Sequence, residues 1–349
     1  MKSRYTFILI MQAFLLLASS CQHDEPENYI KPEDQRKVLF LTNTGEIYDQ
    51  NDQLVTALPN CTFASQIISE KGDYFVSGTN ENKRVGYWKN GKWNTLHVDF
   101  IEDVNHWIDG IGKWDSYIYL LDHPHVLKNS GIFRIEDAKR FLPAKEALAV
   151  SEGECYVVGH KVTDDSNGEF LPVLYTEHKG VFTAEILPLF GNAIRGECTC
   201  VYAYNRTHCL IGGSIDGWPV IWVDKKLEVL PLSEASIDDY DIDTRLGEVC
   251  SITECNGEVY AAGTEVLEKK SSVATIWHNG EIRHLEYFPD ISMSSEVVKI
   301  MTYGSDVYVV TLEYFYDENH EFITTTVLWK NEAPVLTITR LQTTSFTVI

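Results

Sequence analysis

The sequence predicts an all-β protein built from a repeated unit of four antiparallel strands. One pattern recurs within residues 36–349: an apolar strand, a connection, a second strand ending in an aromatic residue, a tight turn and a short third strand. No helical periodicity of useful length follows residue 30. The apolar strands, such as YFVSG at 74–78 and VYVV at 307–310, do not alternate with polar residues. Such continuous runs are typical of strands buried on both faces.

The units follow one another at regular spacing. Their apolar strands begin near Tyr74, Tyr117, Cys155, Cys209, Val259 and Val307, at intervals of 43, 38, 54, 50 and 48 residues. A further strand-like stretch precedes most of them, as SQIISEKG does at 65–72, and supplies the first of four strands. Four antiparallel strands in roughly 40–50 residues is the period of a β-propeller blade.

One more unit is divided between the two ends of the repeat region. Residues 37–43, 46–50 and 54–58 supply three strands and lack the first, and the β-branched stretch TTSFTVI at 343–349 can supply it. Such closure protects strand edges from pairing with other chains. The sequence therefore predicts a seven-bladed β-propeller of four-stranded antiparallel blades, closed by the C-terminal strand and formed by residues 36–349.

The period and the aromatic end of the third strand resemble those of kelch and WD-repeat propellers. The signatures of those families are absent, because the Gly-Gly pair occurs only at Gly212-Gly213 and Trp-Asp does not recur. The resemblance implies the fold and names no activity.

The N-terminus has the pattern of a secretory signal peptide. Lys2 and Arg4 precede an apolar run, Phe7–Ala18, that is too short to span a bilayer as a helix. The sequence LLLASSC at 15–21 resembles the lipobox of bacterial lipoproteins, which implies removal of residues 1–20 and acylation of Cys21. The lipobox usually has Leu at the position of Ala18, so ordinary cleavage near Ala18 stays open as the alternative.

The segment after Cys21 predicts where the protein is located in the cell. QHDEPE at 22–27 resembles the acidic export signal of surface lipoproteins in some Gram-negative bacteria. This implies an outer-membrane protein at the cell surface, with residues 21–35 as a lipidated tether and the lipid as its sole contact with the membrane. Because the formal charge is −22, nucleic acid is excluded as a partner.

The connections between strands indicate one binding face. Those after the second and fourth strands of each unit share a face and include the long segments 160–170, 189–196, 233–247, 264–271 and 312–322. Long loops on a rigid scaffold are the usual place for binding. The candidate ligand-binding residues on this face are aromatic: Trp107, Trp218, Tyr240, Tyr314 and Tyr316. Rings near carboxylates suit sugar recognition, so we expect non-catalytic binding of a glycan or an envelope protein.

Histidines provide an alternative. His123, His125 and His160 are expected on the same face and could bind a divalent metal, as a metal-assisted carbohydrate lyase or hydrolase would need. An acidic run at 238–243 has oxygen ligands for Ca²⁺ but lacks the Gly and terminal Glu of a calcium loop, so a solvated loop is favoured. No phosphate loop, serine nucleophile elbow or HExxH motif is present. We therefore expect no cofactor, and an envelope scaffold subunit is the third hypothesis.

The cysteines beyond Cys21 are odd in number. Cys155 and Cys209 fall at one repeat position, and Cys200 and Cys250 at another, which favours a small apolar packing role. A disulfide between Cys250 and Cys255 stays open, because sequence alone cannot assign connectivity.

Overall fold

The computed structural model describes residues 36–96, 108–122, 125–129, 131–135, 141–163, 169–233, 246–267 and 270–349. The chain divides into two compact units, Met1–Arg36 and Lys37–Ile349, and the strands belong to the second. Within the described residues the regular secondary structure is β-strand, without a helix. This confirms the all-β prediction.

The strands form antiparallel sheets in which sequence neighbours pair. One sheet has the order β28-β1-β2-β3 and contains β1 (Val38–Leu41), β2 (Glu46–Asp49), β3 (Leu54–Ala57) and β28 (Ser345–Val348). The next contains β4 (Cys61–Glu70), β5 (Asp73–Asn80), β6 (Val85–Lys89) and β7 (Lys92–Thr95). A third contains β8 (Ile108–Trp114), β9 (Tyr117–Asp122), β10 (His125–Lys128) and β11 (Gly131–Arg134).

An eight-stranded sheet follows. Its first half contains β12 (Phe141–Ser151), β13 (Glu154–Val162), β14 (Phe170–His178) and β15 (Val181–Ile186). Its second half contains β16 (Gly196–Asn205), β17 (His208–Ile215), β18 (Trp218–Val223) and β19 (Lys226–Val229). The halves are joined by one parallel pair, Glu146 with Cys200.

The last two sheets are again four-stranded. One contains β20 (Gly247–Cys255), β21 (Glu258–Leu267), β22 (Lys270–His278) and β23 (Glu281–His284). The other contains β24 (Ser294–Tyr303), β25 (Asp306–Tyr316), β26 (Phe322–Lys330) and β27 (Ala333–Thr339).

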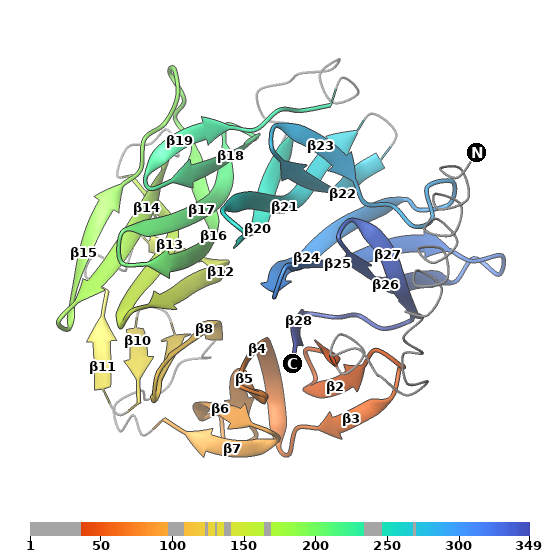
Figure 1. Cartoon of the computed structure of the whole chain (residues 1–349), viewed down its shortest axis with the longest axis horizontal. Helices are drawn as coiled ribbons and strands as arrows, with labels where there is room; N and C mark the ends of the chain where they lie inside the picture. The colour runs from red at the N-terminus through yellow and green to blue at the C-terminus, as the bar shows by residue number, and fades with distance from the viewer. Residues whose placement is uncertain are drawn as a thin grey trace, which may run out of the picture. The chain divides into compact units, whose positions relative to one another are not determined.

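Within residues 37–349 the sheets follow one another around a common centre (Figure 1). The first strand of each unit is innermost, and β4, β8, β12, β16, β20 and β24 contact one another in that order. The C-terminal strand β28 contacts both β24 and β4, and it pairs with β1 from Val38–Val348 to Leu41–Ser345. Antiparallel four-stranded units around an axis define a β-propeller, the fold that the repeat period predicts.

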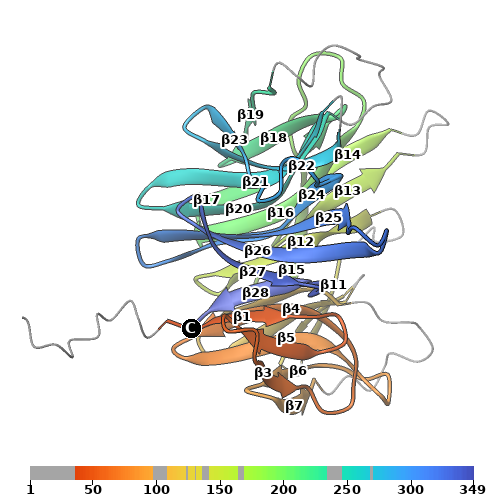
Figure 2. The ribbon, with the colours of Figure 1, turned by 90° about the vertical axis from the view of Figure 1, so that its right-hand side faces the viewer.

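The turn residues explain why the units fold locally as hairpins. Asn90-Gly91 and Asn279-Gly280 both have positive φ at each residue, 48° and 79° in the first pair and 51° and 77° in the second. Asn and Gly tolerate these angles, and such two-residue turns match the twist of a hairpin. The short turns and the longer connections lie on opposite sides, left and right in Figure 2. We call them the short-turn face and the long-loop face.

The core lies between the sheets. One apolar cluster joins Phe40 and Phe346 of the first sheet to Val310 and Leu328 of β25 and β26. The second strands, such as β17, are buried along nearly their whole length because a neighbouring sheet covers each face. This explains their continuous apolar runs.

The aromatic residue near the end of the third strand connects neighbouring units. The indole Nε1 of Trp88, Trp222 and Trp277 donates a hydrogen bond to the carbonyl oxygen of Pro59, Pro188 and Pro231, at 3.2, 2.9 and 2.8 Å respectively. Each proline follows the last strand of the preceding unit. The recurring aromatic is therefore a structural residue that fixes the connection beside it.

The expectation of long loops at 264–271 and 312–322 is wrong for most of their length. Strand β25 continues to Tyr316 and β26 begins at Phe322, so that Tyr316 pairs with Phe322 and only 317–321 connect them. Likewise, β21 continues to Leu267 and β22 begins at Lys270. Cross-strand pairs of β-prone residues extend these hairpins beyond the apolar runs.

The cysteines in the described residues are free, and Cys155, Cys198, Cys200, Cys209 and Cys255 are buried. This confirms the packing role for Cys155, Cys200 and Cys209, whereas Cys250 is only partly buried. Cys250 and Cys255 are not joined by a disulfide. The expected equivalence of Cys200 and Cys250 is wrong. Cys200 faces Gly212 after a register irregularity, and the residue that faces Ala262 after the same irregularity of β20 is Ser251. Thr199 and Cys250 are the unpaired bulge residues of the two strands, so Cys250 is equivalent to Thr199 and Ser251 is equivalent to Cys200.

Candidate functional site

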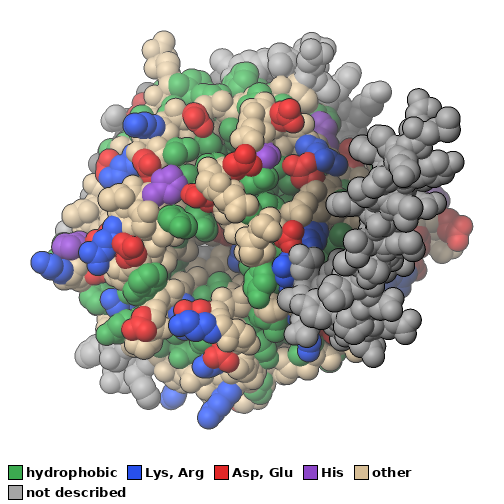
Figure 3. All heavy atoms as spheres, viewed as in Figure 1, with side chains coloured by type: hydrophobic (Ala, Val, Ile, Leu, Met, Phe, Trp, Pro, Cys, Tyr) green, Lys and Arg blue, Asp and Glu red, His purple; other side chains and the backbone are tan. Residues whose placement is uncertain are grey.

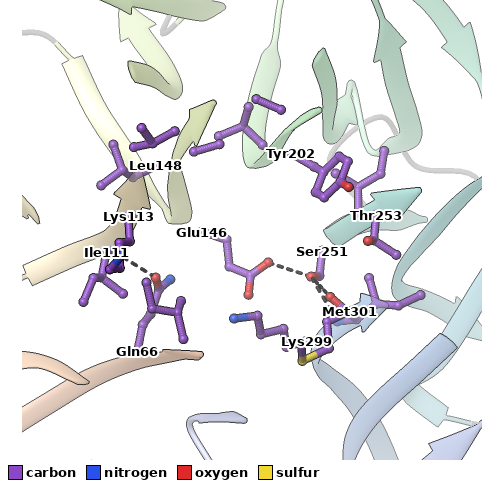
Figure 4. Close-up of a pocket in the computed structure, with 18 of the residues that line it drawn as sticks. Gln66, Ile111, Lys113, Glu146, Leu148, Tyr202, Ser251, Thr253, Lys299 and Met301 are labelled. Carbon is purple, nitrogen blue, oxygen red and sulfur yellow. Dashed lines mark hydrogen bonds between the residues drawn. The ribbon is translucent and has the colours of Figure 1, made fainter. Parts of the chain in front are cut away.

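A cavity of about 310 Å³ lies among the innermost strands. Residues of β4, β8, β12, β16, β20 and β24 line it (Figure 4). Most of them come from the second half of their strands, as Thr253 and Met301 do, so the cavity lies toward the short-turn face. Its size is at the lower end of small-molecule pockets, roughly 300–1,000 Å³.

A repeated position supplies the polar side chains of the cavity. Gln66, Ser251 and Lys299 each directly precede a buried isoleucine of an innermost strand. The Ser251 hydroxyl donates to Glu146 Oε2 at 2.6 Å and accepts a hydrogen bond from the Ile300 amide at 3.1 Å. Gln66 Oε1 accepts one from the Ile111 amide at 3.2 Å. These bonds join neighbouring innermost strands and hold the cavity walls in place.

The cavity also contains charged side chains. Glu146 and Lys299 point into the same space from β12 and β24 (Figure 4). Lys113 forms an ion pair with Glu70 and donates to the Asp115 carbonyl oxygen at 2.5 Å. Lys299 is half-buried, and among the described residues it has no hydrogen-bond or ion-pair partner.

The surface around this cavity has mixed charge. Figure 3 shows the side of the molecule that faces the viewer in Figure 1, which is the short-turn face. Outside the part drawn in grey, acidic and basic side chains lie interspersed on it. The charged side chains inside the cavity are therefore not part of a larger surface patch of one charge.

A second candidate site is an aromatic cluster on the long-loop face, formed by Tyr314, Tyr316 and Phe322. The ring of Phe322 stacks on that of Tyr314 at 5.9 Å between centroids and meets that of Tyr316 edge to face at 5.6 Å. Tyr316 and Phe322 are 53% and 56% exposed. Rings at these distances stabilise one another and present a preformed aromatic surface.

The cluster has a polar side. The Tyr314 hydroxyl donates a hydrogen bond to the Glu296 carboxylate. Burial, and then this hydrogen bond, raise the pKa of Tyr314 well above its usual value, so the phenol stays neutral and donates. Glu321, at the adjacent turn, forms an ion pair of 3.1 Å with Arg340. Carboxylates beside exposed rings are the combination that suits sugar hydroxyls and ring faces.

Neighbouring exposed apolar residues lie on the connection between β23 and β24. Tyr287, Ile291 and Met293 are exposed there. The fully buried Glu313 accepts hydrogen bonds from the amides of Tyr287 and Phe288, which anchors this connection to β25. Glu265 occupies the equivalent position on β21 and accepts one from the Ser233 amide. These buried carboxylates therefore position loops of the long-loop face.

The aromatic residues singled out from the sequence are partly brought together. Tyr314 and Tyr316 lie side by side in the cluster, whereas Trp218 begins β18 in a different sheet. Trp107 and Tyr240 lie outside the described residues. The sequence interpretation missed Phe322, although its high β propensity six positions after Tyr316 could have revealed the hairpin.

The histidines proposed as metal ligands are only partly described. His125 begins β10 and His160 lies in β13, where its ring meets that of Phe170 at 5.0 Å, while His123 lies outside the described residues. Across the described ranges, no three His, Cys, Asp or Glu side chains gather in an arrangement that could hold a metal ion. The metal site stays a prediction.

The cavity residues were also missed from the sequence. Gln66, Ser251 and Lys299 are polar residues placed before a buried isoleucine in the first strand of a unit. This repeated position could have indicated them. For Glu146 the signal is weaker, because β12 has a register irregularity between Pro143 and Leu148.

Comparisons with known proteins found solved structures of similar fold and no matching family. No protein-family model matches the chain, and no curated protein sequence matches it. A puromycin-hydrolysing peptidase of Mycobacterium tuberculosis is similar over 89% of this chain and 53% of its own, with a TM-score of 0.51 and 9% identity. The chain thus spans about half the length of that peptidase.

Two further solved structures have lower scores. Apo AztD from Citrobacter koseri matches over 90% of this chain and 98% of its own, with a TM-score of 0.48 and 10% identity. YCF48 from Cyanidioschyzon merolae matches over 79% and 88%, with a TM-score of 0.46 and 11% identity. The similarity to the peptidase shows the fold alone. This chain is a β-propeller protein whose function has to be argued from its own residues.

Proposed function

We propose that residues 36–349 form a seven-bladed propeller closed by β28. The support is that β12–β15 and β16–β19 are each a four-stranded antiparallel unit, joined by the single pair of Glu146 and Cys200. Further support is that β28 pairs with β1 and contacts the innermost strands on either side of it. In this arrangement every blade has its first strand at the axis.

We propose further that the protein is a non-catalytic ligand-binding lipoprotein that recognises a glycan on its long-loop face. The observation that carries this is the aromatic cluster of Tyr314, Tyr316 and Phe322, with Glu296 hydrogen-bonded at its side. Two of its rings are more than half exposed, although burial of such side chains is strongly favourable. Stacking of a sugar ring would cover them, and the carboxylates would accept its hydroxyl hydrogens.

The test is a glycan array followed by titration with the best oligosaccharide. Tyr316→Ala and Phe322→Ala should each weaken binding by about tenfold, which corresponds to about 1.4 kcal/mol. Tyr204→Ala is the matched control, because Tyr204 is also strongly exposed but lies at the short-turn end of β16. An array without hits, or equal losses in all three variants, would contradict glycan binding at the cluster. Capture of an envelope protein through the cluster would replace the glycan by a protein ligand.

The proposed anchor is the lipid on Cys21. Its support is the signal-peptide pattern, the LLLASSC sequence and the acidic segment that follows. In the described part of the chain, no helix is long and apolar enough to cross a membrane. A Cys21→Ala protein should move from the detergent phase to the aqueous phase in phase partitioning, and aqueous partitioning of the wild type would contradict the lipoprotein.

One measurement tests the alternative hypothesis of a metal-assisted carbohydrate lyase or hydrolase. Metal analysis of the purified wild type and of a His125→Ala variant would support it only if a stoichiometric metal is present and is lost in the variant.

A further inference from the structure

The cavity at the innermost strands has features that the glycan proposal does not use. The polar side chains at the repeated position of three innermost strands, two of which line the cavity, bind the backbone of the adjacent strand. Ser345, Gln66 and Ser251 accept hydrogen bonds from the amides of Ile67, Ile111 and Ile300 at 3.3, 3.2 and 3.1 Å. In each case the acceptor side chain lies on one innermost strand and the amide on the next. These side chains therefore have a structural function.

Lys299 occupies the same position on β24 but does not form the equivalent bond. Its ammonium group has no partner among the described residues and is directed into the cavity (Figure 4). A half-buried charge without a partner is costly, and water or an anionic group can offset that cost. The ammonium group is therefore available to a ligand.

Glu146 supplies the opposite charge. Its carboxylate accepts a hydrogen bond from Ser251, across the cavity from β20, which orients it toward the interior (Figure 4). Each carboxylate oxygen can accept more than one hydrogen bond. A ligand ammonium group could thus bind Glu146 without displacing Ser251.

The rest of the wall is largely apolar. The partly buried apolar side chains that line it are Ile68, Ala149, Val150, Ala203 and Met301. The volume of about 310 Å³ is sufficient for a small molecule with an apolar body. A dianion would be repelled by Glu146 and by the formal charge of −22, and a neutral sugar would use neither the opposite charges nor the aliphatic walls.

From this arrangement we propose that the cavity binds a small zwitterion with an apolar side chain, an apolar amino acid or a short apolar peptide. Its carboxylate binds Lys299, its ammonium group binds Glu146, and its side chain contacts the aliphatic wall. This site is separate from the aromatic cluster, since it lies toward the short-turn face.

Calorimetric titration with four probes tests the proposal on the wild type: L-leucine, L-leucyl-L-leucine, N-acetyl-L-leucine and L-leucinamide. At least one of the first two should bind with a dissociation constant of about 1 mM or lower. N-acetyl-L-leucine lacks the ammonium group and L-leucinamide lacks the carboxylate. Each should bind about tenfold more weakly, the scale of one charge-assisted hydrogen bond. No binding of either zwitterion, or equal binding of all probes, overturns the proposal.

Variants then assign the two charges. Lys299→Gln should remove the preference for L-leucine over L-leucinamide, and Glu146→Gln the preference over N-acetyl-L-leucine. Gln at 146 can still accept from Ser251, so the walls should persist. Lys226→Gln and Glu228→Gln, on the outer strand β19, are the matched controls and should keep both preferences. Unchanged preferences in the cavity variants would contradict the assignment, and the four-probe series on the wild type decides the proposal if a variant does not fold.

Discussion

Phe346→Ala should destabilise the propeller strongly, because Phe346 lies in the short C-terminal strand that pairs with the first strand of the fold. Its side chain is 0% exposed and packs in one cluster with Phe40, Val310 and Leu328. Burial of a Phe side chain contributes about 1.5–3 kcal/mol. The cavity left between two sheets cannot fully collapse, which brings the expected loss to about 3–5 kcal/mol.

The assay is guanidinium unfolding followed by tryptophan fluorescence. Phe322→Ala is the matched control, because the same atoms are removed from a side chain that is 56% exposed, and its change should stay at about 0.5–1.5 kcal/mol, the scale of its ring contacts with Tyr314 and Tyr316. A Phe346→Ala midpoint equal to that of the wild type would refute the reasoning that β28 is an integral strand. A cooperative transition is needed for the comparison, since a multistep curve has no single free energy.

Deletion of residues 343–349 extends the same test. It removes the ladder with β1 and the bond from Ser69 Oγ to the Val348 carbonyl oxygen, 2.7 Å long. The exposed edges of β1 and the gap beside β4 should promote aggregation. A synthetic peptide of this sequence should restore the monomer when added in excess. A truncated protein that is monomeric and as stable as the wild type would contradict the closing role of β28.

Three further predictions concern single side chains. The hydrogen bonds to Asp224, and then to Glu254, raise the pKa of His208, so its stabilising effect is present below the unfolded value of 6.5 and is lost as the pH rises through the raised native pKa. His208→Gln should therefore reduce the difference between unfolding free energies at about pH 6 and about pH 8, and an unchanged difference would be contrary evidence. Trp277→Phe removes the donor to Pro231 and should cost about 1–3 kcal/mol in the same unfolding assay, whereas the exposed Trp114→Phe should change little. Burial raises the pKa of the thiols of Cys155, Cys198, Cys200 and Cys209, so these should react with a thiol reagent only after unfolding. The partly buried Cys250 should react first, and rapid native labelling of the buried four would count against the packing.

The local chemistry of the sequence was enough to predict the strands and their hairpins. Asn-Gly pairs such as Asn279-Gly280 mark turns that need positive φ at both residues. Continuous apolar strands such as β17 indicate burial on both faces, which in turn indicates stacked sheets. These signals lie within a few neighbouring residues, so they could be interpreted without knowledge of the rest of the chain. The lengths of the hairpins were less accessible, because cross-strand pairs such as Tyr316 with Phe322 extend them.

Only the tertiary structure decided which side chains meet. Ser251 and Glu146 are 105 residues apart and share a hydrogen bond because their strands, β20 and β12, both lie at the axis. Lys299 enters the same cavity from β24. The repeat period indicates four strands in each unit, but the unpaired bulge residue Cys250 decides that Ser251 takes the repeat position of Cys200 and lines the cavity. The bulge lies in the pairing of β20 with β21, and the other strands that line the cavity are distant in the chain.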